Sequence, residues 1–455
     1  MENNIKNIDL IKLILHSKLK IPSDRSEIFY EQVKMHDAEN LEKLYPNLKT
    51  FCVAPFIHLS TKTDGSIKTC CRALPGSGFS NIKNESLRES WNNKKIKKIR
   101  LDLLNGIRNK NCQPCWHDED KNVYSLREKI NTVPSRQESA IAAIKTMHDD
   151  GHIETNPTWL ELKTSNVCNL KCRMCHPMDS TSWSQDFDKI KHIHEDQWQN
   201  HIQKLDFKKD GQIDVYDENF YNDLKNAIPN LKEVHFAGGE VLYDENHYRI
   251  LDMLLPYAKN IHLGYATNMT ILKFKNYNVV DYWKNFKKVE LACSIDGPKK
   301  LSEYIRSGSN ADNVEENIKI LLDYKNIKII GKLTVSALNI FYIPEALEWF
   351  NDMNVHRTDL HFVTFPKFLD CSIWKDKPRL LITNKLFDYK EKVSNQKSYE
   401  RKRIPLTVGA AYNFFTSKET YDKDLWNKFI EYNKILDQSR NQSYKDFDFL
   451  REYMT

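Results

Sequence analysis

The sequence predicts a mixed α/β protein: a partial (β/α)6 TIM barrel, preceded by a small α+β domain and followed by a helical region. From residue 157 onward, short apolar segments alternate with helical segments, which is typical of a parallel sheet covered by helices. Six such strand segments can be counted, fewer than the eight of a complete barrel. Hydrophobic residues make up 40% of the 455 residues, which is enough for a core and argues against a disordered chain.

The six predicted strands are rich in apolar and β-branched residues. They are residues 158–165, 233–240, 261–268, 289–297, 327–337 and 359–365. Ahead of them, residues 51–71 indicate a hairpin around the turn Asp64-Gly65, and a helix is expected from its N-cap Ser86 to Gly106. The predicted segments are a helical extension (1–50), the α+β domain (51–125), a helical connector (126–156), the barrel (157–366) and the helical C-terminal region (367–455).

Charge and cysteine content limit the class of protein. The net charge of +6 is small for this length, so we expect no nucleic-acid partner. The basic run at residues 94–100 is interpreted as the solvated face of a helix, with a groove for an acidic substrate as the alternative. No apolar run is long enough for a membrane span and the N-terminus lacks signal-peptide order, so we expect a cytoplasmic protein. Ten cysteines in such a protein indicate metal or redox chemistry.

Three cysteines, Cys168, Cys172 and Cys175, follow directly after the first predicted barrel strand. Parallel barrels place their active sites at the carboxyl ends of their strands. A structural zinc site or an electron-transfer cluster takes four protein ligands, and this loop supplies three. The triplet alone therefore leaves two interpretations: a zinc site with a distant fourth ligand, or a centre with an open position.

Polar residues and glycines stand at the ends of the next three strands. The second strand ends in Gly238-Gly239-Glu240, where the glycines let a ligand approach and Glu240 can accept from an ammonium group. The third ends in residues 266–268 (ATN), and the fourth in residues 294–297 (SIDG), followed by Arg306. Each alone is typical of an ordinary βα loop, but their succession predicts one shared cavity.

In this order, CNLKCRMC, AGGE, ATN and SIDGP with a downstream arginine resemble the radical S-adenosylmethionine (SAM) superfamily over about residues 157–365. The resemblance implies that the three cysteines hold a [4Fe–4S] cluster whose fourth iron binds SAM. It also implies SAM contacts: the amino group at Gly238, Gly239 and Glu240, the ribose at Ser294 and Asp296, the carboxylate at Arg306, the adenine near Met174, and further contacts from Thr267, Asn268, Val335 and Asn339.

Five further cysteines precede the barrel, in a pattern that resembles the auxiliary-cluster modules called twitch and SPASM domains. Such modules commonly follow the barrel, whereas this one precedes it. A SPASM domain has about seven cysteines for two clusters, so the resemblance implies one auxiliary [4Fe–4S] cluster here. Its expected ligands are Cys52, Cys112, Cys115 and Cys70, with Cys71 as the alternative to Cys70. A zinc ribbon is the alternative kind of site.

The resemblance implies a radical SAM enzyme that abstracts hydrogen from a substrate. By analogy we expect a peptide or protein side chain that is crosslinked, oxidised or epimerised, with a flavodoxin- or ferredoxin-type electron donor. Dehydrogenation or epimerisation of a sugar or other small metabolite is the alternative activity, and a non-catalytic iron–sulfur or zinc scaffold is the alternative class. Cys371, after the sixth strand, is a candidate hydrogen donor, while Cys293 is expected in the core.

Overall fold

The computed structural model describes residues 50–74, 79–120, 125–194, 212–417 and 419–454. The helical extension predicted at residues 1–50 lies outside the described residues, apart from Thr50. The chain divides into two compact units: unit 1 comprises residues 1–162 and 215–235, and unit 2 comprises residues 163–214 and 236–455. The boundaries between the units fall within two of the barrel strands.

Unit 1 is built around the predicted hairpin. Strand β1 (His58–Thr61) pairs antiparallel with β2 (Ser66–Lys68), β2 pairs with β3 (Ser80–Asn81), and β1 runs parallel to β4 (Trp159–Lys163). Gly65 has φ +81° in the turn between β1 and β2, a conformation that favours glycine. The helices of the unit are α4 (Ala54–Ile57), α5 (Leu87–Trp91), α6 (Lys94–Leu104), α7 (Gln113–Asp120), α8 (Leu126–Asn131), α9 (Pro134–Lys145) and α12 (Glu218–Ala227).

Two local predictions in unit 1 are partly wrong. Residues 54–57 form the short helix α4 instead of a hairpin arm, because Pro55 in its first turn favours a helix start and cannot donate to a strand ladder. The helix expected from Ser86 to Gly106 is divided into α5 and α6. Ser86 caps α5 as predicted, but the side chain of Asn93 accepts from the backbone of Lys95 and starts a second helix.

Arg100 contradicts the interpretation of the basic run as a purely solvated face. Its side chain is fully buried, its Nε donates to the Pro55 carbonyl at 2.8 Å, and its guanidinium lies 4.1 Å above the Trp91 ring. Its Nη atoms donate to the carbonyls of Trp91 and Gly151. The guanidinium therefore satisfies three backbone carbonyls and fixes α6 within unit 1.

Unit 2 contains most of the barrel. Strands β7 (His262–Thr267), β10 (Lys288–Ser294), β12 (Ile327–Val335) and β13 (Arg357–Phe362) pair in parallel in this order. With β4 and β6 (Glu233–Ala237), the strand order is β4-β6-β7-β10-β12-β13. The predicted six-stranded partial barrel is confirmed. Each predicted strand extends beyond the observed one because its last residues leave the sheet and enter the loop that follows the strand.

Strand β10 shows how the sheet separates core residues from site residues. Buried and half-buried residues alternate along it, as expected for side chains that point to opposite faces. Cys293 lies on the fully buried face, and its neighbour Ser294 lies on the other face at the end of the strand. Cys293 is thus a core residue, as expected.

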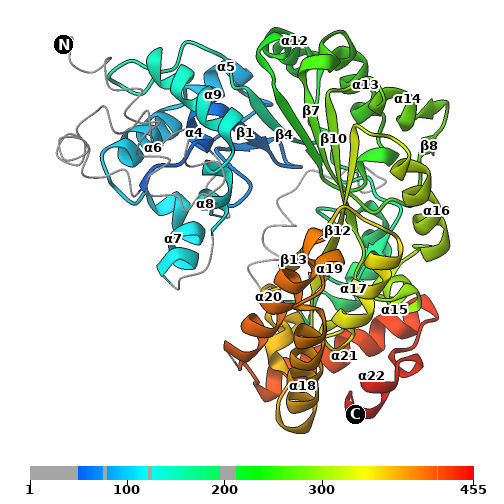
Figure 1. Cartoon of the computed structure of the whole chain (residues 1–455). Coiled ribbons are helices and arrows are strands. Elements are labelled where there is room, and N and C mark those ends of the chain that lie inside the picture. Colours follow the sequence, from blue (N-terminus) through cyan, green and yellow to red (C-terminus); the bar gives the residue numbers. More distant parts are fainter. Residues whose placement is uncertain (1–49, 75–78, 121–124, 195–211, 418, 455) are drawn as a thin grey trace. The chain divides into compact units, whose positions relative to one another are not determined.

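The helices of unit 2 cover the strands and continue into the C-terminal region. Figure 1 shows the C-terminal helices in orange and red, gathered beside β12 and β13, which confirms the predicted helical region. The helices and short strands of the unit are β5 (Lys171–Cys172), α10 (Ser184–Ile190), α13 (Glu245–Leu254), β8 (Lys273–Phe274), β9 (Tyr277–Asn278), α14 (Val279–Trp283), α15 (Lys299–Ile305), β11 (Arg306–Ser307), α16 (Ala311–Leu322), α17 (Ile343–Asp352), α18 (Asp376–Val393), α19 (Lys397–Arg401), α20 (Ile404–Ser417), α21 (Lys423–Arg440) and α22 (Asp448–Tyr453).

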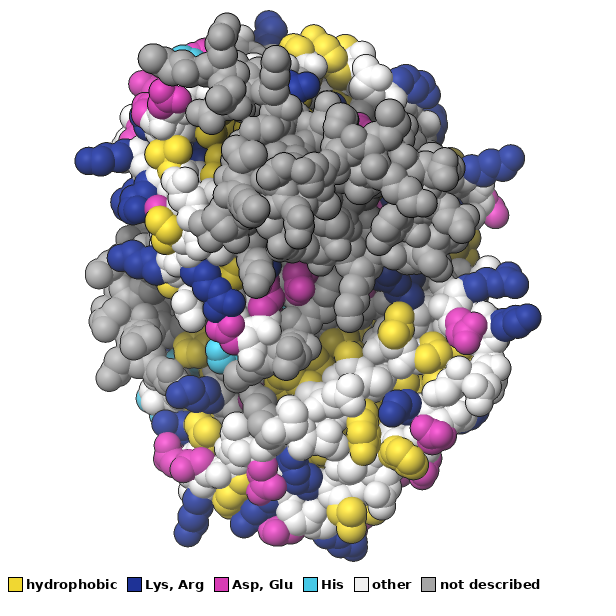
Figure 2. Space-filling view, turned by 60° about the vertical axis from the view of Figure 1, so that its left-hand side comes forward, with side chains coloured by type: hydrophobic (Ala, Val, Ile, Leu, Met, Phe, Trp, Pro, Cys, Tyr) yellow, Lys and Arg dark blue, Asp and Glu magenta, His cyan; other side chains and the backbone are white. Residues whose placement is uncertain are grey.

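The described surface carries charges of both signs. On the face drawn in Figure 2, Lys and Arg side chains are interspersed with Asp and Glu side chains. Among the described residues, no helix has the length and apolar character needed to cross a membrane.

Candidate active site

A cavity of about 350 Å³ in unit 2 is lined by the loops that follow β4, β6, β7 and β10. Carboxyl ends of parallel strands meet at one edge of a sheet, which is why loops distant in sequence share this cavity. The structure brings most of the predicted barrel-site residues together here: Cys168, Cys172, Met174, Cys175, Gly238, Gly239, Glu240, Thr267, Asn268, Ser294 and Arg306.

Gly238 and Gly239 allow the β6 loop to pack directly against the segment that leads into the cysteines. The Gly239 amide donates to the Ser165 carbonyl at 3.1 Å, and the Glu240 amide donates to the Val167 carbonyl at 2.7 Å. A Cβ at Gly239 would lie 2.1 Å from the Val167 oxygen. Gly238 has φ +124°, and its Cβ would lie 2.8 Å from the Ser165 oxygen. The glycines thus serve contact within the chain as well as any approach of a ligand.

The carboxylate of Glu240 is almost fully occupied by hydrogen bonds from Leu242, just after it, and from Thr267 and Asn268 at the end of β7. Its Oε1 accepts from the Thr267 hydroxyl at 2.7 Å and the Leu242 amide at 3.2 Å, and its Oε2 accepts from the Asn268 amide at 2.6 Å. Burial raises the pKa of Glu240, and these three hydrogen bonds oppose the shift. A carboxylate has about four lone-pair sites. One site on Oε2 is therefore left for an ammonium donor.

Arg306 connects the fourth strand loop to the cysteine loop, defined here as residues 168–175. It pairs with Cys172 between β11 and β5, and its Nη1 donates to the Cys172 sulfur at 3.6 Å. Its Nε lies 2.8 Å from Asp296 Oδ2, and the other oxygen of Asp296 accepts from the Thr334 amide at 2.7 Å. Burial raises the pKa of Asp296, and the charge of Arg306 lowers it. The ion pair therefore orients the guanidinium toward the sulfur.

The three thiols of the cysteine loop fit a [4Fe–4S] cluster. They line one cavity, and hydrogen-bond donors are directed at two of the sulfurs: the Leu170 amide at Cys168 (3.5 Å) and Arg306 at Cys172. Burial raises the pKa of all three thiols, and their mutual charge raises those of Cys168 and Cys175 further. Donors on the sulfurs stabilise the thiolate that an iron–sulfur ligand must be.

Four predicted residues do not line this cavity. Asp296 and Asn339 are fully buried, and the Asn339 amide donates to the carbonyls of Asp296 and Thr334, so both act as supports of the β10 and β12 loops. Val335 is a buried residue at the end of β12. Cys371 is fully buried in a short turn after β13. The predicted contacts of these residues with SAM or substrate are therefore not supported by their positions.

Three titratable residues of the lining were not predicted. Lys163, at the end of β4, lies 3.2 Å from Asp179, whose other carboxylate oxygen lies 3.3 Å from His176 Nε2. The signal in the sequence was a charged residue at the end of a barrel strand and two polar residues just after the last cysteine. Together they form a polar wall beside the cysteine loop.

In unit 1, the predicted auxiliary ligands share one environment. Burial raises the pKa of Cys52, Cys70, Cys112 and Cys115, to about 12 for Cys70 and Cys112. The next causes are the charges of the other cysteines: Cys112 acts on Cys52, Cys52 on Cys70, and Cys70 on Cys112. Charges act in this way only over short distances, so these sulfurs lie near one another.

Cys71 has a different neighbour. The residue as a whole is exposed, but burial of its thiol raises its pKa, as does the charge of Glu161, with which the thiol also forms a hydrogen bond. Arg127, by contrast, lowers the pKa of Cys52 and Cys112 by its charge and donates to the Phe51 carbonyl at 2.6 Å. The positions favour Cys70 over Cys71 as the fourth ligand.

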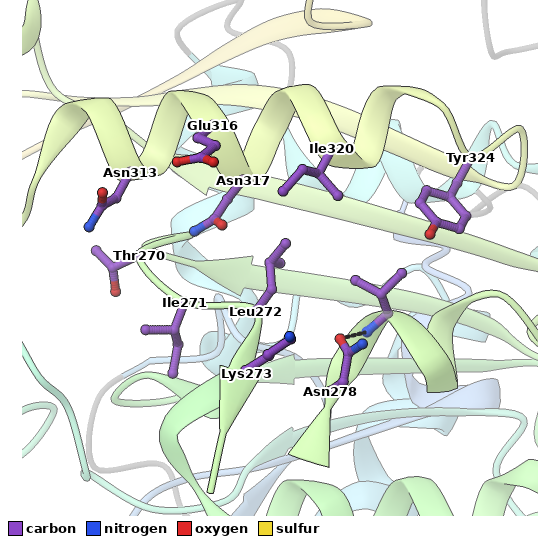
Figure 3. Close-up of a pocket in the computed structure, with 11 residues that line it drawn as sticks. Thr270, Ile271, Leu272, Lys273, Asn278, Asn313, Glu316, Asn317, Ile320 and Tyr324 are labelled. Carbon is purple, nitrogen blue, oxygen red and sulfur yellow. Dashed lines mark hydrogen bonds between the residues drawn. The ribbon is translucent and has the colours of Figure 1, made fainter. Parts of the chain in front are cut away.

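Figure 3 shows a second cavity in unit 2, of about 440 Å³, between α16 and the β8–β9 hairpin. Its described lining includes aliphatic side chains, Asn317 and Tyr324, and no cysteine. It adjoins the first site through the loop after β7: Thr270 Oγ1 donates to Asn268 Oδ1 at 2.7 Å, and Asn317 donates to the Met269 carbonyl at 2.9 Å. Most of the predicted barrel-site residues therefore line the first cavity, and none lines the second.

Comparison with protein families agrees with this geometry. Residues 162–350 match the radical SAM superfamily, and residues 52–116 match SPASM, an iron-sulfur cluster-binding domain. Residues 162–350 thus form a radical SAM domain, and a SPASM-type domain precedes it at residues 52–116. The cofactors of the chain are accordingly a [4Fe–4S] cluster, SAM and an auxiliary iron–sulfur cluster.

Solved structures that the chain resembles include Streptococcus suis SuiB bound to S-adenosylmethionine (14% identity, 67% of this chain, 64% of that chain, TM-score 0.34). SuiB bound to the precursor peptide SuiA is 13% identical, with 66% of this chain and 62% of that chain covered and a TM-score of 0.36. Native anSMEcpe with bound AdoMet is 16% identical, with 52% of this chain and 61% of that chain covered and a TM-score of 0.35. The chain spans about three fifths of the length of these structures. A comparison with curated proteins gave no match.

Proposed function

We propose that this protein is a radical SAM enzyme that removes a hydrogen atom from a peptide or protein side chain, leading to a crosslink, an oxidation or an epimerisation. One observation carries the proposal: the loops that follow four barrel strands bring three thiols, the Glu240 carboxylate and the Arg306 guanidinium to one cavity. Only one lone-pair site of that carboxylate is left for a ligand. When bound, the cluster and SAM together supply a 5′-deoxyadenosyl radical that attacks an unactivated C–H bond.

Different residues of the cavity bind the cluster and the different groups of SAM. Cys168, Cys172 and Cys175 would hold the cluster. The free lone pair of Glu240 Oε2 accepts from the SAM ammonium, beside Gly238 and Gly239. A guanidinium has five N–H donors, and Arg306 directs two of its nitrogens at Asp296 and Cys172, which leaves donors for a carboxylate.

The remaining lining residues orient the nucleoside. Ser294 is half-buried at the end of β10 and offers a hydroxyl to the ribose. Met174 supplies an apolar contact for the adenine. Thr267 and Asn268 act through Glu240, because their hydroxyl and amide hold its carboxylate in place.

The activity is tested with two matched triple variants. The first replaces Cys168, Cys172 and Cys175 by Ala, and the second replaces Cys52, Cys112 and Cys115 by Ala. Reconstituted wild type should hold about eight iron atoms, from two four-iron clusters, and each variant about four. Only the first should lose 5′-deoxyadenosine formation with SAM and dithionite. If the first variant still releases deoxyadenosine, the proposed activity is wrong.

The substrate class rests on the auxiliary-cluster resemblance, and we propose a cytoplasmic flavodoxin- or ferredoxin-type protein as the electron donor. A direct test incubates the reconstituted enzyme with a peptide encoded beside its gene, in deuterated water. Loss of two hydrogens from the peptide indicates oxidation or crosslinking, and uptake of one solvent deuterium indicates epimerisation. Turnover of sugars with no change in any peptide would instead favour the small-metabolite alternative.

A further inference from the structure

Side chains that lie outside the cysteine loop hold its backbone by hydrogen bonds to the carbonyl oxygens. Five of these oxygens accept hydrogen bonds from side chains later in the chain. The pairs are Cys168 with Ser182 (2.7 Å), Leu170 with Ser180 (2.7 Å), Lys171 with Arg440 (2.6 Å), Cys172 with Trp183 (2.9 Å) and Arg173 with Tyr432 (2.6 Å). Two of the five donors, Tyr432 and Arg440, belong to the C-terminal helix α21.

Arg173, within the cysteine loop, extends into the same helix. Its side chain is fully buried, and its guanidinium donates to Asp437 Oδ1 at 2.5 Å and Asn433 Oδ1 at 3.0 Å. The guanidinium also lies 3.7 Å from the centre of the Tyr304 ring. A buried charge needs a partner of opposite sign. Helix α21 supplies that partner.

A second ion pair fastens the end of α21 to the segment just after the cysteine loop. Arg440 Nε donates to Asp186 Oδ2 at 2.9 Å, and Ser439 donates to Asp186 Oδ1 at 2.6 Å. The side chains of Arg440 and Asp186 are 1% and 3% exposed, so solvent does not screen this pair. The guanidinium also lies 4.6 Å from the centre of the Trp183 ring.

We propose that α21 is a working part of the barrel cluster site: it positions the sulfurs by holding the cysteine loop through Arg173, Tyr432 and Arg440. The only strand in the loop, β5, spans two residues, so its own regular structure fixes little. Groups behind the ligands of a metal centre hold them in binding geometry. The inference rests on the proposed function, since it takes these cysteines as the cluster ligands.

The test compares Asp437→Asn with Asp424→Asn in the full chain. Both variants remove one carboxylate from α21, but Asp424 is exposed and pairs only with the solvent-facing Lys428 at 2.9 Å. After anaerobic reconstitution, iron release to a chelator is followed well below the unfolding temperature. The auxiliary cluster serves as an internal standard.

In Asp437→Asn we expect about half of the iron to leave on the order of tenfold faster, the usual size of such effects on metal affinity. We also expect an altered effect of SAM on the electron paramagnetic resonance spectrum of the reduced cluster. Asp424→Asn should match wild type in both measurements. A helix that is merely structural would lower the unfolding temperature and leave both measurements unchanged.

Arg440→Lys is the second variant, and it decides the question if Asp437→Asn does not fold. It keeps the charge opposite Asp186 but loses the planar group that also reaches the Lys171 carbonyl. Wild-type iron release and spectra in the folded variants would overturn the role of α21. If SAM leaves the wild-type spectrum unchanged, the proposed function itself fails. The two failures are thus distinguished.

Discussion

Replacing Gly239 by Ala should loosen the barrel site, because this position has no room for a side chain. The new Cβ would lie 2.1 Å from the Val167 oxygen, where ordinary contacts begin beyond 3 Å, so the backbone must move by about 1 Å. That movement breaks two hydrogen bonds, from Gly239 to Ser165 and from Glu240 to Val167. At about 1–3 kcal/mol for each buried bond and a similar cost for overpacking, the free energy of unfolding should fall by roughly 3–9 kcal/mol.

Urea unfolding of the cluster-free chain measures this loss, and iron content after reconstitution measures its effect on the site. Gly409→Ala in α20 is the matched control, since nothing lies within 4 Å of its Cβ. It should stabilise the chain by about 0.5–1 kcal/mol, the usual gain of Ala over Gly in a helix. If Gly239→Ala unfolds like Gly409→Ala and binds iron normally, the packing argument is refuted.

Cys70→Ala should halve the iron bound per chain and Cys71→Ala should leave it unchanged, because only Cys70 shares its surroundings with the other auxiliary cysteines; equal losses would contradict the assignment. Burial lowers the pKa of His247 to about 3, so folding keeps this ring neutral while the unfolded chain protonates it below about pH 6.5. Its contribution to stability is therefore complete above pH 6.5 and decreases by about 2 kcal/mol down to pH 5, a slope that His247→Gln should remove in urea unfolding at several pH values. The Cys371→Ala variant, assayed in deuterated water, should incorporate as much solvent deuterium into the product as wild type, since Cys371 is fully buried and does not line the cavity. Loss of that deuterium would instead show that Cys371 is the hydrogen donor.

Strand identity and the position of the site could be predicted because both depend on local sequence patterns. Apolar, β-branched segments mark the strands, and short polar motifs at their ends mark one edge of the sheet. Glu240, Ser294 and Arg306 reach the predicted cavity for this reason. The same pattern misplaces Asp296, because a motif does not tell which side chain faces the cavity and which supports it from behind.

Features set by distant partners escaped prediction. The basic run at residues 94–100 was predicted to face solvent. The side chain of Arg100 is buried instead, and it donates hydrogen bonds to the carbonyls of Pro55 and Gly151. Pro55 and Gly151 lie outside the window of residues from which helical periodicity is judged. The division of the helix predicted from Ser86 to Gly106 has a local cause instead: Asn93 caps a second helix rather than continuing the first.

The cysteine loop makes the same point for function. Its spacing identifies the chemistry, but the contacts that fix its sulfurs come from far along the chain: Arg306 at Cys172, Asp437 at Arg173 and Arg440 at the Lys171 carbonyl. Each contact joins a charged group to the loop across more than 130 residues. If the motif alone were transferred to another barrel, the three cysteines would be present, but the distant contacts that orient their sulfurs would be missing. Placement of the sulfurs depends on the C-terminal helical region, for which sequence periodicity suggested no role.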